Sequence, residues 1–178
     1  MDGYQISSIF DKFPETKYLF QGIYSNDTIP RIIQNTNGFL VINTISESDN
    51  NKIGHWLLIF INEKNTIYFF DSFGNEPQFY GQNISKCFDS YPFRKVIVFS
   101  KPIQNEFSMV CGAYVIMFGY LMSKHRKASY IKSKFGRNSC KNDEIAVNFL
   151  YKNIGSGADL CPRVVFNRKC NRNCHCCK

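Results

Sequence analysis

Residues 111–122 read CGAYVIMFGYLM, a run of twelve residues that contains no charged side chain. Apolar residues on every side of a 3.6-residue repeat are typical of a helix that is buried all round. We therefore expect a core helix from Cys111 to Ser123. A bilayer span needs about 20 apolar residues, so this run is too short to cross a membrane and we expect no membrane contact. The length of 178 residues predicts one main domain built around this helix.

A β-hairpin is predicted upstream of this helix. Trp56–Ile61 is apolar on both faces, which is typical of a central strand, and Thr66–Phe70 is the return strand after a polar turn. A turn centred near Glu63 pairs residues whose numbers add up to about 126. His55 and Asp71 then lie directly opposite each other at one edge of the sheet. A slip of one residue would keep them close but change the faces of their side chains.

Further elements follow from local patterns along the chain. We expect helices at Ile6–Phe13 and Glu76–Phe88, and a helix with Asn142 as its N-cap that runs to about Asn153. We expect strands at Gly38–Thr44 and Lys95–Ser100, the second of them buried. The composition changes after Gly155-Ser156-Gly157. We therefore place the main domain at 1–158 and a flexible basic, Cys-rich tail at 159–178.

Four polar residues in this framework have the chemistry of a cysteine hydrolase. A helix N-terminus favours an anion at Cys111, and His55 would take the thiol proton. Asp71 would fix the tautomer of His55 and stabilise its imidazolium form. Gln104 stands seven residues before Cys111 and would form an oxyanion hole with the backbone N–H of the cysteine. The reaction that fits is acyl transfer from a peptide carbonyl to water through a thioester.

Each of these residues also has an ordinary structural interpretation. A cysteine in an apolar helix is usually a small buried side chain, and a histidine beside a tryptophan is often structural. The segment around Asp71 is also typical of a turn with an aspartate hydrogen bond, and Gln104 alone carries little information. The order of the residues and the geometry of the hairpin favour the catalytic interpretation.

The charge of the chain is uneven. Residues 1–120 hold nine Lys and Arg against eleven Asp and Glu, whereas residues 121–178 hold thirteen against three. The net charges are therefore −2 and +10, in agreement with the total of +8. A basic C-terminal third predicts contact with a polyanion, DNA first. A solvated basic face or a targeting signal would give the same pattern.

The eight cysteines fall into two groups. The segment Met1–Tyr4 has neither the basic nor the apolar part of a secretory signal, so we expect an intracellular protein with free thiols. The scattered group is Cys87, Cys111, Cys140 and Cys161, and the second group is Cys170, Cys174, Cys176 and Cys177. The close spacing of the second group is unlike that of zinc knuckles, so we predict no metal site. The alternatives for this tail are a set of reactive thiols or a disulfide link to a partner peptide.

The motifs resemble those of the adenovirus endopeptidase (adenain) family of cysteine proteases, whose relatives include proteases that remove SUMO and other ubiquitin-like proteins. The resemblance covers roughly residues 15–155 and is specific at four motifs, with weaker similarity at Tyr18–Tyr24 and from Asn142 to Leu150. The motifs are Gly54-His55-Trp56, Phe70-Asp71-Ser72-Phe73-Gly74, Gln104 and Cys111-Gly112-Ala113.

The resemblance implies an α+β fold in which a mixed sheet carries the histidine and the aspartate and packs on the helix that begins with the cysteine. It implies a base at His55, its orienter at Asp71, a nucleophile at Cys111 and an oxyanion donor at Gln104. It also implies cleavage of viral precursor proteins during particle maturation, in the virion or the host nucleus.

The chemistry itself is expected to need no cofactor, and the family implies stimulation by DNA and by a short viral peptide. The family pattern would place the cysteine that pairs with this peptide near Phe93, where the chain has none, and Cys87 is the nearest.

Two other functions stay open from the sequence. One is an isopeptidase that acts on a SUMO- or ubiquitin-like protein, because His55-Trp56 and Asp71 suit both kinds of enzyme. The other is an inactive DNA-binding packaging protein that keeps the fold. The short chain and the basic end favour the maturation protease, and the intact set of four polar residues argues against the inactive protein.

Overall fold

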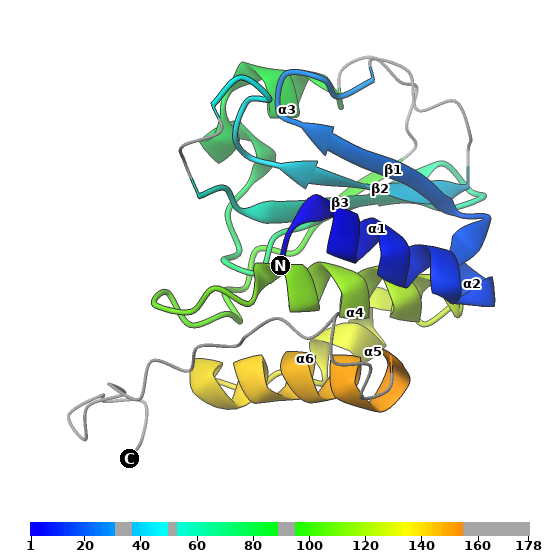
Figure 1. The fold of residues 1–178 in the computed structure, drawn as a ribbon, viewed down its shortest axis with the longest axis vertical. Helices are drawn as coiled ribbons and strands as arrows, with labels where there is room; N and C mark the ends of the chain where they lie inside the picture. Colours follow the sequence, from blue (N-terminus) through cyan, green and yellow to red (C-terminus); the bar gives the residue numbers. More distant parts are fainter. Residues whose placement is uncertain (31–36, 50–52, 89–94, 155–178) are drawn as a thin grey trace.

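A five-stranded mixed sheet forms the centre of the protein (Figure 1). The computed structural model describes residues 1–30, 37–49, 53–88 and 95–154. The strands lie in the order β1-β2-β3-β4-β5; the two outer pairs are parallel and the two inner pairs antiparallel. The predicted α+β class with a mixed sheet is confirmed. The strands are β1 (Phe20–Ser25), β2 (Gly38–Asn43), β3 (Trp56–Ile61), β4 (Thr66–Phe70) and β5 (Lys95–Val98).

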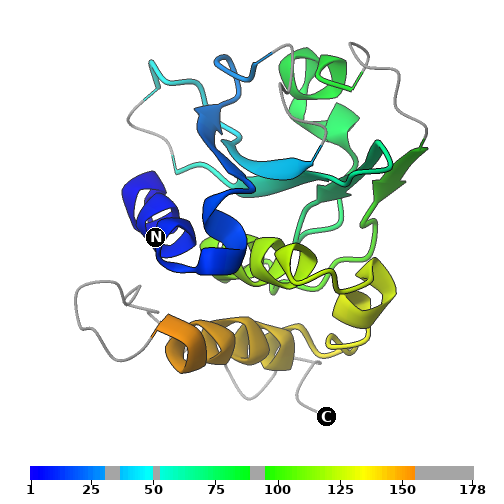
Figure 2. The ribbon, with the colours of Figure 1, turned by 90° about the vertical axis from the view of Figure 1, so that its right-hand side faces the viewer.

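Helices cover both faces of the sheet. In Figures 1 and 2, α1 and α4 lie against one face, α3 lies over the other, and α6 lies beyond α4. Alternate strand residues therefore supply two separate apolar cores, one on each side of the sheet. The helices are α1 (Gly3–Lys12), α2 (Pro14–Lys17), the 3₁₀ helix η1 (Pro77–Tyr80), α3 (Gln82–Lys86), α4 (Cys111–Ser123), α5 (Ala128–Lys132) and α6 (Ser139–Ile154).

Helix α4 packs against strand β3 in the core on one side of the sheet. The sequence predicted the bounds of both elements as they are observed, and every residue of β3 is buried. Gly119 lets the two elements approach closely, because a Cβ atom there would lie 3.0 Å from the Phe10 ring and 3.1 Å from Leu58. In the described part of the chain, no helix combines the length and the apolar character needed to cross a membrane.

The hairpin of β3 and β4 forms as predicted, with a different register. Leu58 pairs with Phe70 and Ile61 with Ile67, so the paired residue numbers add up to 128 rather than 126. The predicted direct opposition of His55 and Asp71 is therefore wrong, and the two residues are diagonal neighbours beyond the ends of the strands. A register shift of two residues leaves every side chain on its predicted face of the sheet. His55 and Asp71 therefore remain close neighbours.

Two other predictions need correction. The expected helix from Glu76 to Phe88 is divided into η1 and α3 at Gly81, which has a φ of +90° that ends one helix before the next begins. The strand expected at Lys95–Ser100 is β5, which ends at Val98. It is a partly exposed edge strand rather than a buried one.

Helix α6 begins earlier than predicted. Asn142 is not its N-cap but a buried residue of the first turns, and its N–H bonds to the carbonyl of Asn138. The side chain of Asn138 accepts from the N–H of Lys141, which is the bond that an N-cap makes. The polar side chains at 142 and 143 therefore face the interior. The predicted boundary at 158 and the tail at 159–178 lie outside the described residues.

We expect Gly119→Ala to destabilise the protein even though alanine has the higher helix propensity. Propensity favours alanine by roughly 1 kcal/mol, but the added methyl group must displace Phe10 or Leu58 in a packed core, and overpacking costs about 1–3 kcal/mol. Urea unfolding followed by the fluorescence of Trp56 measures the balance. Gly136→Ala is the matched control, because nothing lies within 4 Å of a Cβ there. Equal or greater stability of Gly119→Ala would contradict this packing.

Candidate active site

His55 and Asp71 meet at one edge of the sheet. His55 directly precedes β3 and Asp71 directly follows β4, so the antiparallel pair brings them to the same end. Nε2 of His55 lies 2.6 Å from Oδ1 of Asp71, and their side chains are 13% and 0% exposed. The backbone N–H of His55 donates to Oγ1 of Thr44 at 2.9 Å, which fixes the chain before the strand. The other ring nitrogen, Nδ1, is left for a second partner.

The carboxylate of Asp71 is held by four hydrogen bonds. Oδ1 accepts from the N–H of Phe73 (2.9 Å) as well as from His55, and Oδ2 accepts from the N–H of Asn75 (2.8 Å) and the hydroxyl of Tyr80 (2.8 Å). Burial opposes its charge, but His55 and these donors outweigh burial and lower the pKa of Asp71. Asp71 is therefore a fixed anion aimed at His55.

Cys111 lies on the other side of His55, at the first residue of α4. Burial opposes the thiolate, but a hydrogen bond and an ion pair with His55 outweigh it and lower the pKa of Cys111. Backbone hydrogen bonds from Trp56 and Gly112 act in the same direction. The N-terminal end of α4 adds the favourable field of the helix dipole. Cys111 is a partly exposed residue rather than a fully buried one.

His55 is the positively charged member of the group formed by Asp71, His55 and Cys111. Burial favours the neutral ring, but hydrogen bonds and charge interactions with Asp71 and Cys111 raise the pKa of His55 to about 9. A pKa of about 9 keeps the ring protonated at neutral pH. The arrangement can therefore hold a thiolate beside an imidazolium, which is the reactive form of a nucleophilic cysteine.

Two aromatic rings fix the plane of the imidazole. The ring of Phe73 is nearly parallel to that of His55, with centroids 4.6 Å apart, and Tyr80 is also nearly parallel at 6.1 Å. Tyr80 thus contacts the histidine through its ring and the aspartate through its hydroxyl. Burial and the charge of Asp71 raise the pKa of Tyr80, so its hydroxyl stays a hydrogen-bond donor across the ordinary pH range. The sequence did not predict this role.

Gln104 is buried in the loop before α4 and is connected to the same site. Oγ of Ser72, the residue after Asp71, donates to Oε1 of Gln104 at 2.6 Å. Nε2 of Gln104 donates to the carbonyl of Ser108 at 2.9 Å. The Ser72 hydroxyl binds the oxygen of the Gln104 amide, so the nitrogen of that amide faces the segment that leads to Cys111. One hydrogen of this nitrogen remains for another acceptor.

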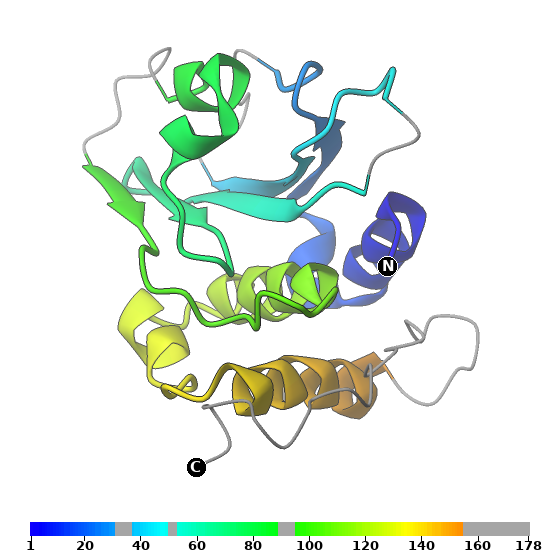
Figure 3. The ribbon, with the colours of Figure 1, turned by 90° about the vertical axis from the view of Figure 1, so that its left-hand side faces the viewer.

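The N-terminal residues of the chain border the nucleophile. The indole N–H of Trp56 donates to the carbonyl of Met1 at 3.1 Å. A Cβ at Gly112 would lie 3.0 Å from the sulfur of Met1, so the small residue after Cys111 makes room for this side chain. Figures 1 and 3 show the N-terminus beside the start of α4. Met1 therefore packs beside Gly112, the residue after the nucleophile, and is held there by Trp56.

The structure brings together the residues that the sequence singled out. His55, Asp71 and Cys111 form one chain of contacts, and Gln104 joins it through Ser72. Sequence reasoning missed Ser72 and Tyr80, because nothing in local spacing reveals which side chain will reach a buried carboxylate. Cys87, the nearest cysteine to the expected peptide-pairing position, is buried after α3.

No family model matches this chain, and no curated protein matches it significantly. Among the described residues, no three His, Cys, Asp or Glu side chains gather in a way that would hold a metal ion.

We expect Tyr80→Phe to move the acidic limb of Cys111 reactivity to higher pH. The hydroxyl lowers the pKa of Asp71, so without it Asp71 is protonated at higher pH and His55 loses its anionic partner. A hydrogen bond to a charged group contributes roughly 1.5–3 kcal/mol, and one pKa unit corresponds to about 1.4 kcal/mol, so we expect a shift of about one to two pH units.

The measurement is the rate of Cys111 alkylation by iodoacetamide as a function of pH, with the modified residue identified by mass spectrometry. Phe79→Leu is the matched control, because Phe79 adjoins Tyr80 but is 71% exposed. An unchanged acidic limb in a folded Tyr80→Phe protein would show that the hydroxyl does not support the site.

Proposed function

We propose that the protein is a cysteine endopeptidase with Cys111 as nucleophile, His55 as general base and acid, and Asp71 as the orienter of His55. The observation that carries the proposal is the chain of contacts from a helix N-terminal thiol through one imidazole to a buried carboxylate that has four donors. A buried cysteine of purely structural role has no need of such partners. Perturbed pKa values at adjacent groups are typical of functional sites.

The proposed reaction has two halves. The Cys111 thiolate attacks the carbonyl carbon, a C–S bond forms, and the carbonyl electron pair moves to the oxygen. The intermediate collapses, the C–N bond breaks, and the amine leaves with the proton of His55. Water then attacks the thioester and gives a proton to His55, and the C–S bond breaks. The products are a carboxylic acid, an amine and the restored thiolate–imidazolium pair.

Gln104 is the proposed side-chain donor to the oxyanion. It lies in the loop before α4, and the hydrogen bond from Ser72 turns its nitrogen toward the nucleophile segment. The backbone N–H of Cys111 at the free end of the helix is the second proposed donor. The two donors would stabilise negative charge on the carbonyl oxygen, which develops only during the reaction.

The proposed substrates are viral precursor proteins that are cleaved during particle maturation, in the virion or the host nucleus. Support comes from the adenain-like order of His55, Asp71, Gln104 and Cys111 and from the mixed sheet that carries the first two residues beside the cysteine helix. The side chain of Met1 packs beside Gly112, next to the nucleophile, so we propose small residues such as glycine at the cleaved bond. A SUMO- or ubiquitin-like isopeptidase is the alternative within the same chemistry.

A DNA contact is proposed for the basic segment that follows α4. Arg126, Lys127, Lys132, Lys134 and Arg137 are exposed there and define what we call the basic surface. Arg126 and Lys134 both lie over the ring of Tyr130, with distances of 5.3 and 4.5 Å to its centroid. A positive surface with an aromatic ring suits a phosphate backbone. The last residue of α4, Ser123, lies roughly 18 Å along the helix from Cys111, and the basic surface begins three residues after it.

We expect hydrolysis of a peptide–aminomethylcoumarin amide with glycine at the cleaved bond to show a bell-shaped pH profile. Activity rises as the thiolate forms and falls above pH 9, because His55, with a pKa of about 9, must be protonated to release the amine. The measurement is coumarin release between pH 5 and pH 11, with Cys111→Ala as the control.

The outcomes separate the candidate functions. Activity that needs Cys111 and no folded partner supports the endopeptidase, whereas cleavage only of a folded ubiquitin-like fusion supports the isopeptidase. Release that survives Cys111→Ala, or that rises steadily past pH 10, contradicts the mechanism. Absence of both activities together with tight DNA binding supports the inactive packaging protein.

We expect Arg126→Ala and Lys127→Ala to weaken binding to a short duplex of mixed sequence and to flatten its salt dependence. Each neutralised phosphate contact contributes about one unit to the slope of log K against log salt. Fluorescence anisotropy at several salt concentrations measures that slope. Lys64→Ala, in the exposed hairpin turn, is the control. A slope that is the same in all three variants would exclude the basic surface as the contact.

A further inference from the structure

The segment Ile103–Ser108 carries Gln104 and belongs to no helix or strand, yet its backbone is tied down on both sides. On the side of the sheet, Ser72 is the anchor. The carbonyl of Ser72 accepts from the N–H groups of Ile103 (2.9 Å) and Gln104 (3.0 Å). The hydroxyl of Ser72 donates to the Gln104 side chain. This side joins the segment to the residue that follows Asp71.

On the opposite side the anchor is helix α6. Nδ2 of Asn142 donates to the carbonyl of Ile103 at 3.0 Å. The N–H of Asn105 donates to Oδ1 of Asp143 at 3.3 Å. These bonds end on the residues that directly precede and follow Gln104. Helix α6 therefore helps to set the position of the Gln104 backbone.

Tyr114 connects the same carboxylate to the nucleophile helix. Its hydroxyl donates to Oδ1 of Asp143 at 2.8 Å, and the carbonyl of Ile103 lies 3.2 Å away as a second acceptor. Tyr114 stands three residues after Cys111, so it lies nearly one turn further along α4. Asp143 thus links the helix that begins with Cys111 to the loop that carries Gln104.

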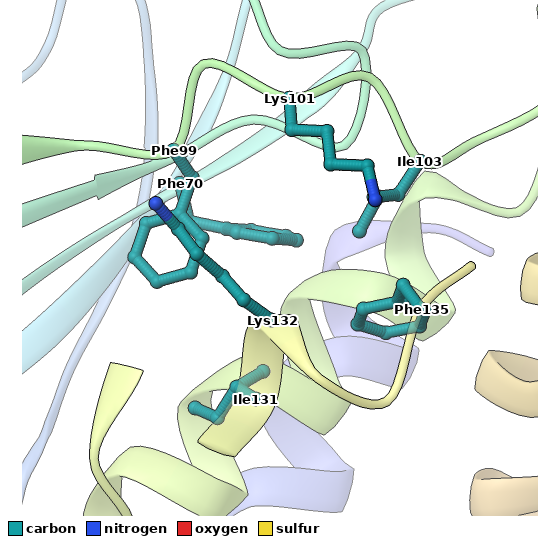
Figure 4. Close-up of a pocket in the computed structure, with 7 residues that line it drawn as sticks. All are labelled: Phe70, Phe99, Lys101, Ile103, Ile131, Lys132 and Phe135. Carbon is teal, nitrogen blue, oxygen red and sulfur yellow. The ribbon is translucent and has the colours of Figure 1, made fainter. Parts of the chain in front are cut away.

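The side chain of Ile103 completes the attachment. It belongs to the same apolar core cluster as Phe70, Phe99 and Phe135, and these four residues and Lys101 line a small pocket (Figure 4). The ring of Phe135 also contacts that of Tyr114, with centroids 5.5 Å apart. Apolar packing therefore holds the side chain of Ile103 while Asn142 and Tyr114 hold its carbonyl.

The burial of the Asp143 carboxyl group at this position is unfavourable for the stability of the fold. It is 4% exposed, and among the described residues no Lys, Arg or His forms an ion pair with it. Burial raises the pKa of Asp143, against the hydrogen bonds of Ser108, Tyr114 and Asn105. A buried carboxyl group without a cation usually destabilises a fold relative to an apolar residue. Its three partners all belong to the Gln104 loop or to the cysteine helix.

We propose that Asp143, through Tyr114 and Asn105, is a positioning residue that holds Gln104 at the distance from Cys111 that an oxyanion requires. The inference rests on the proposed function and adds to it a second support for the site, on α6. Asp143 does not touch the substrate or the thiol. It acts on the geometry of the oxyanion donors and not on the protonation of Cys111, which is governed by His55 and Asp71 on the other side of the site.

Two reactions of the same thiol separate these effects. Iodoacetamide alkylates Cys111 by displacing iodide from a saturated carbon, so no oxyanion forms. p-Nitrophenyl acetate acetylates Cys111 by attack of the thiolate on the carbonyl, formation of a C–S bond and departure of p-nitrophenolate. That reaction passes through a tetrahedral oxyanion. The rate of each, taken as the difference from Cys111→Ala, is measured in wild type and variants.

Tyr114→Phe is the first variant, because it removes only the hydroxyl group that donates a hydrogen bond to Asp143. Asp143→Ala is the second, and Asp143→Asn, which keeps an acceptor oxygen, should recover part of the loss. We expect acetylation to fall about tenfold or more, because small displacements in an active site have large effects on rate. Alkylation should stay within about twofold of wild type, because the Cys111–His55 pair is untouched. Glu144→Gln, at the exposed neighbouring position on α6, should change neither rate.

The outcomes are distinct for the two proposals. Wild-type Cys111 that is alkylated no faster than an ordinary thiol overturns the proposed function, and this inference with it. An activated wild-type thiol with unchanged acetylation in Tyr114→Phe overturns this inference alone. Equal losses in both reactions also overturn it, because they mean that the network supports the thiol rather than the oxyanion. If Asp143→Ala does not fold, Tyr114→Phe decides alone.

Discussion

The close contact between α4 and β3 sets the position of every group in the candidate site. Gly119 brings the helix against Leu58, and both elements are buried along their length. The first residue of the helix is Cys111, and the residue before the strand is His55. Packing of apolar side chains therefore determines whether a thiol and an imidazole meet. The sheet then adds Asp71 from the end of β4, and the loop before α4 adds Gln104.

The charges of the site exist because each has a partner. Desolvation acts against the ionised forms of Asp71, His55 and Cys111 alike, and each of the three is stabilised by its neighbours. Asp71 has the most donors, so it is the fixed charge to which the other two respond. The backbone N–H groups of the turn hold Asp71, Asp71 holds His55, and His55 stabilises the thiolate of Cys111. The buried carboxyl group of Asp143 on α6 has hydrogen-bond donors but no cation partner among the described residues. Its donors belong to the Gln104 loop and to α4, which is why we assign it a role in shaping that loop.

The sequence predicts the parts of this structure that depend on local pattern. The helix at 111–123 and the two strands of the hairpin follow from apolar periodicity, and their order brings His55 close to Asp71. The register was wrong by two, because it depends on how the Asn62–Asn65 turn closes, where Asn65 adopts a φ of +55°. The start of α6 was wrong because Asn138 competes with Asn142 as a cap. The parallel pairings and the roles of Ser72, Tyr80 and Asp143 depend on tertiary contacts, which no local pattern records.

The most direct test of the account is the site-resolved rate of Cys111 alkylation by iodoacetamide across pH, in wild type, His55→Ala and His125→Ala. Mass spectrometry must identify the modified residue, because the chain has seven other cysteines. His125 is an exposed histidine just after α4, so its replacement is the matched control. The account predicts reactivity that persists well below the ordinary thiol pKa of about 8.5, is lost in His55→Ala and is unchanged in His125→Ala. Labelling that rises only near that pKa, and equally in all three proteins, would contradict an activated cysteine–histidine pair.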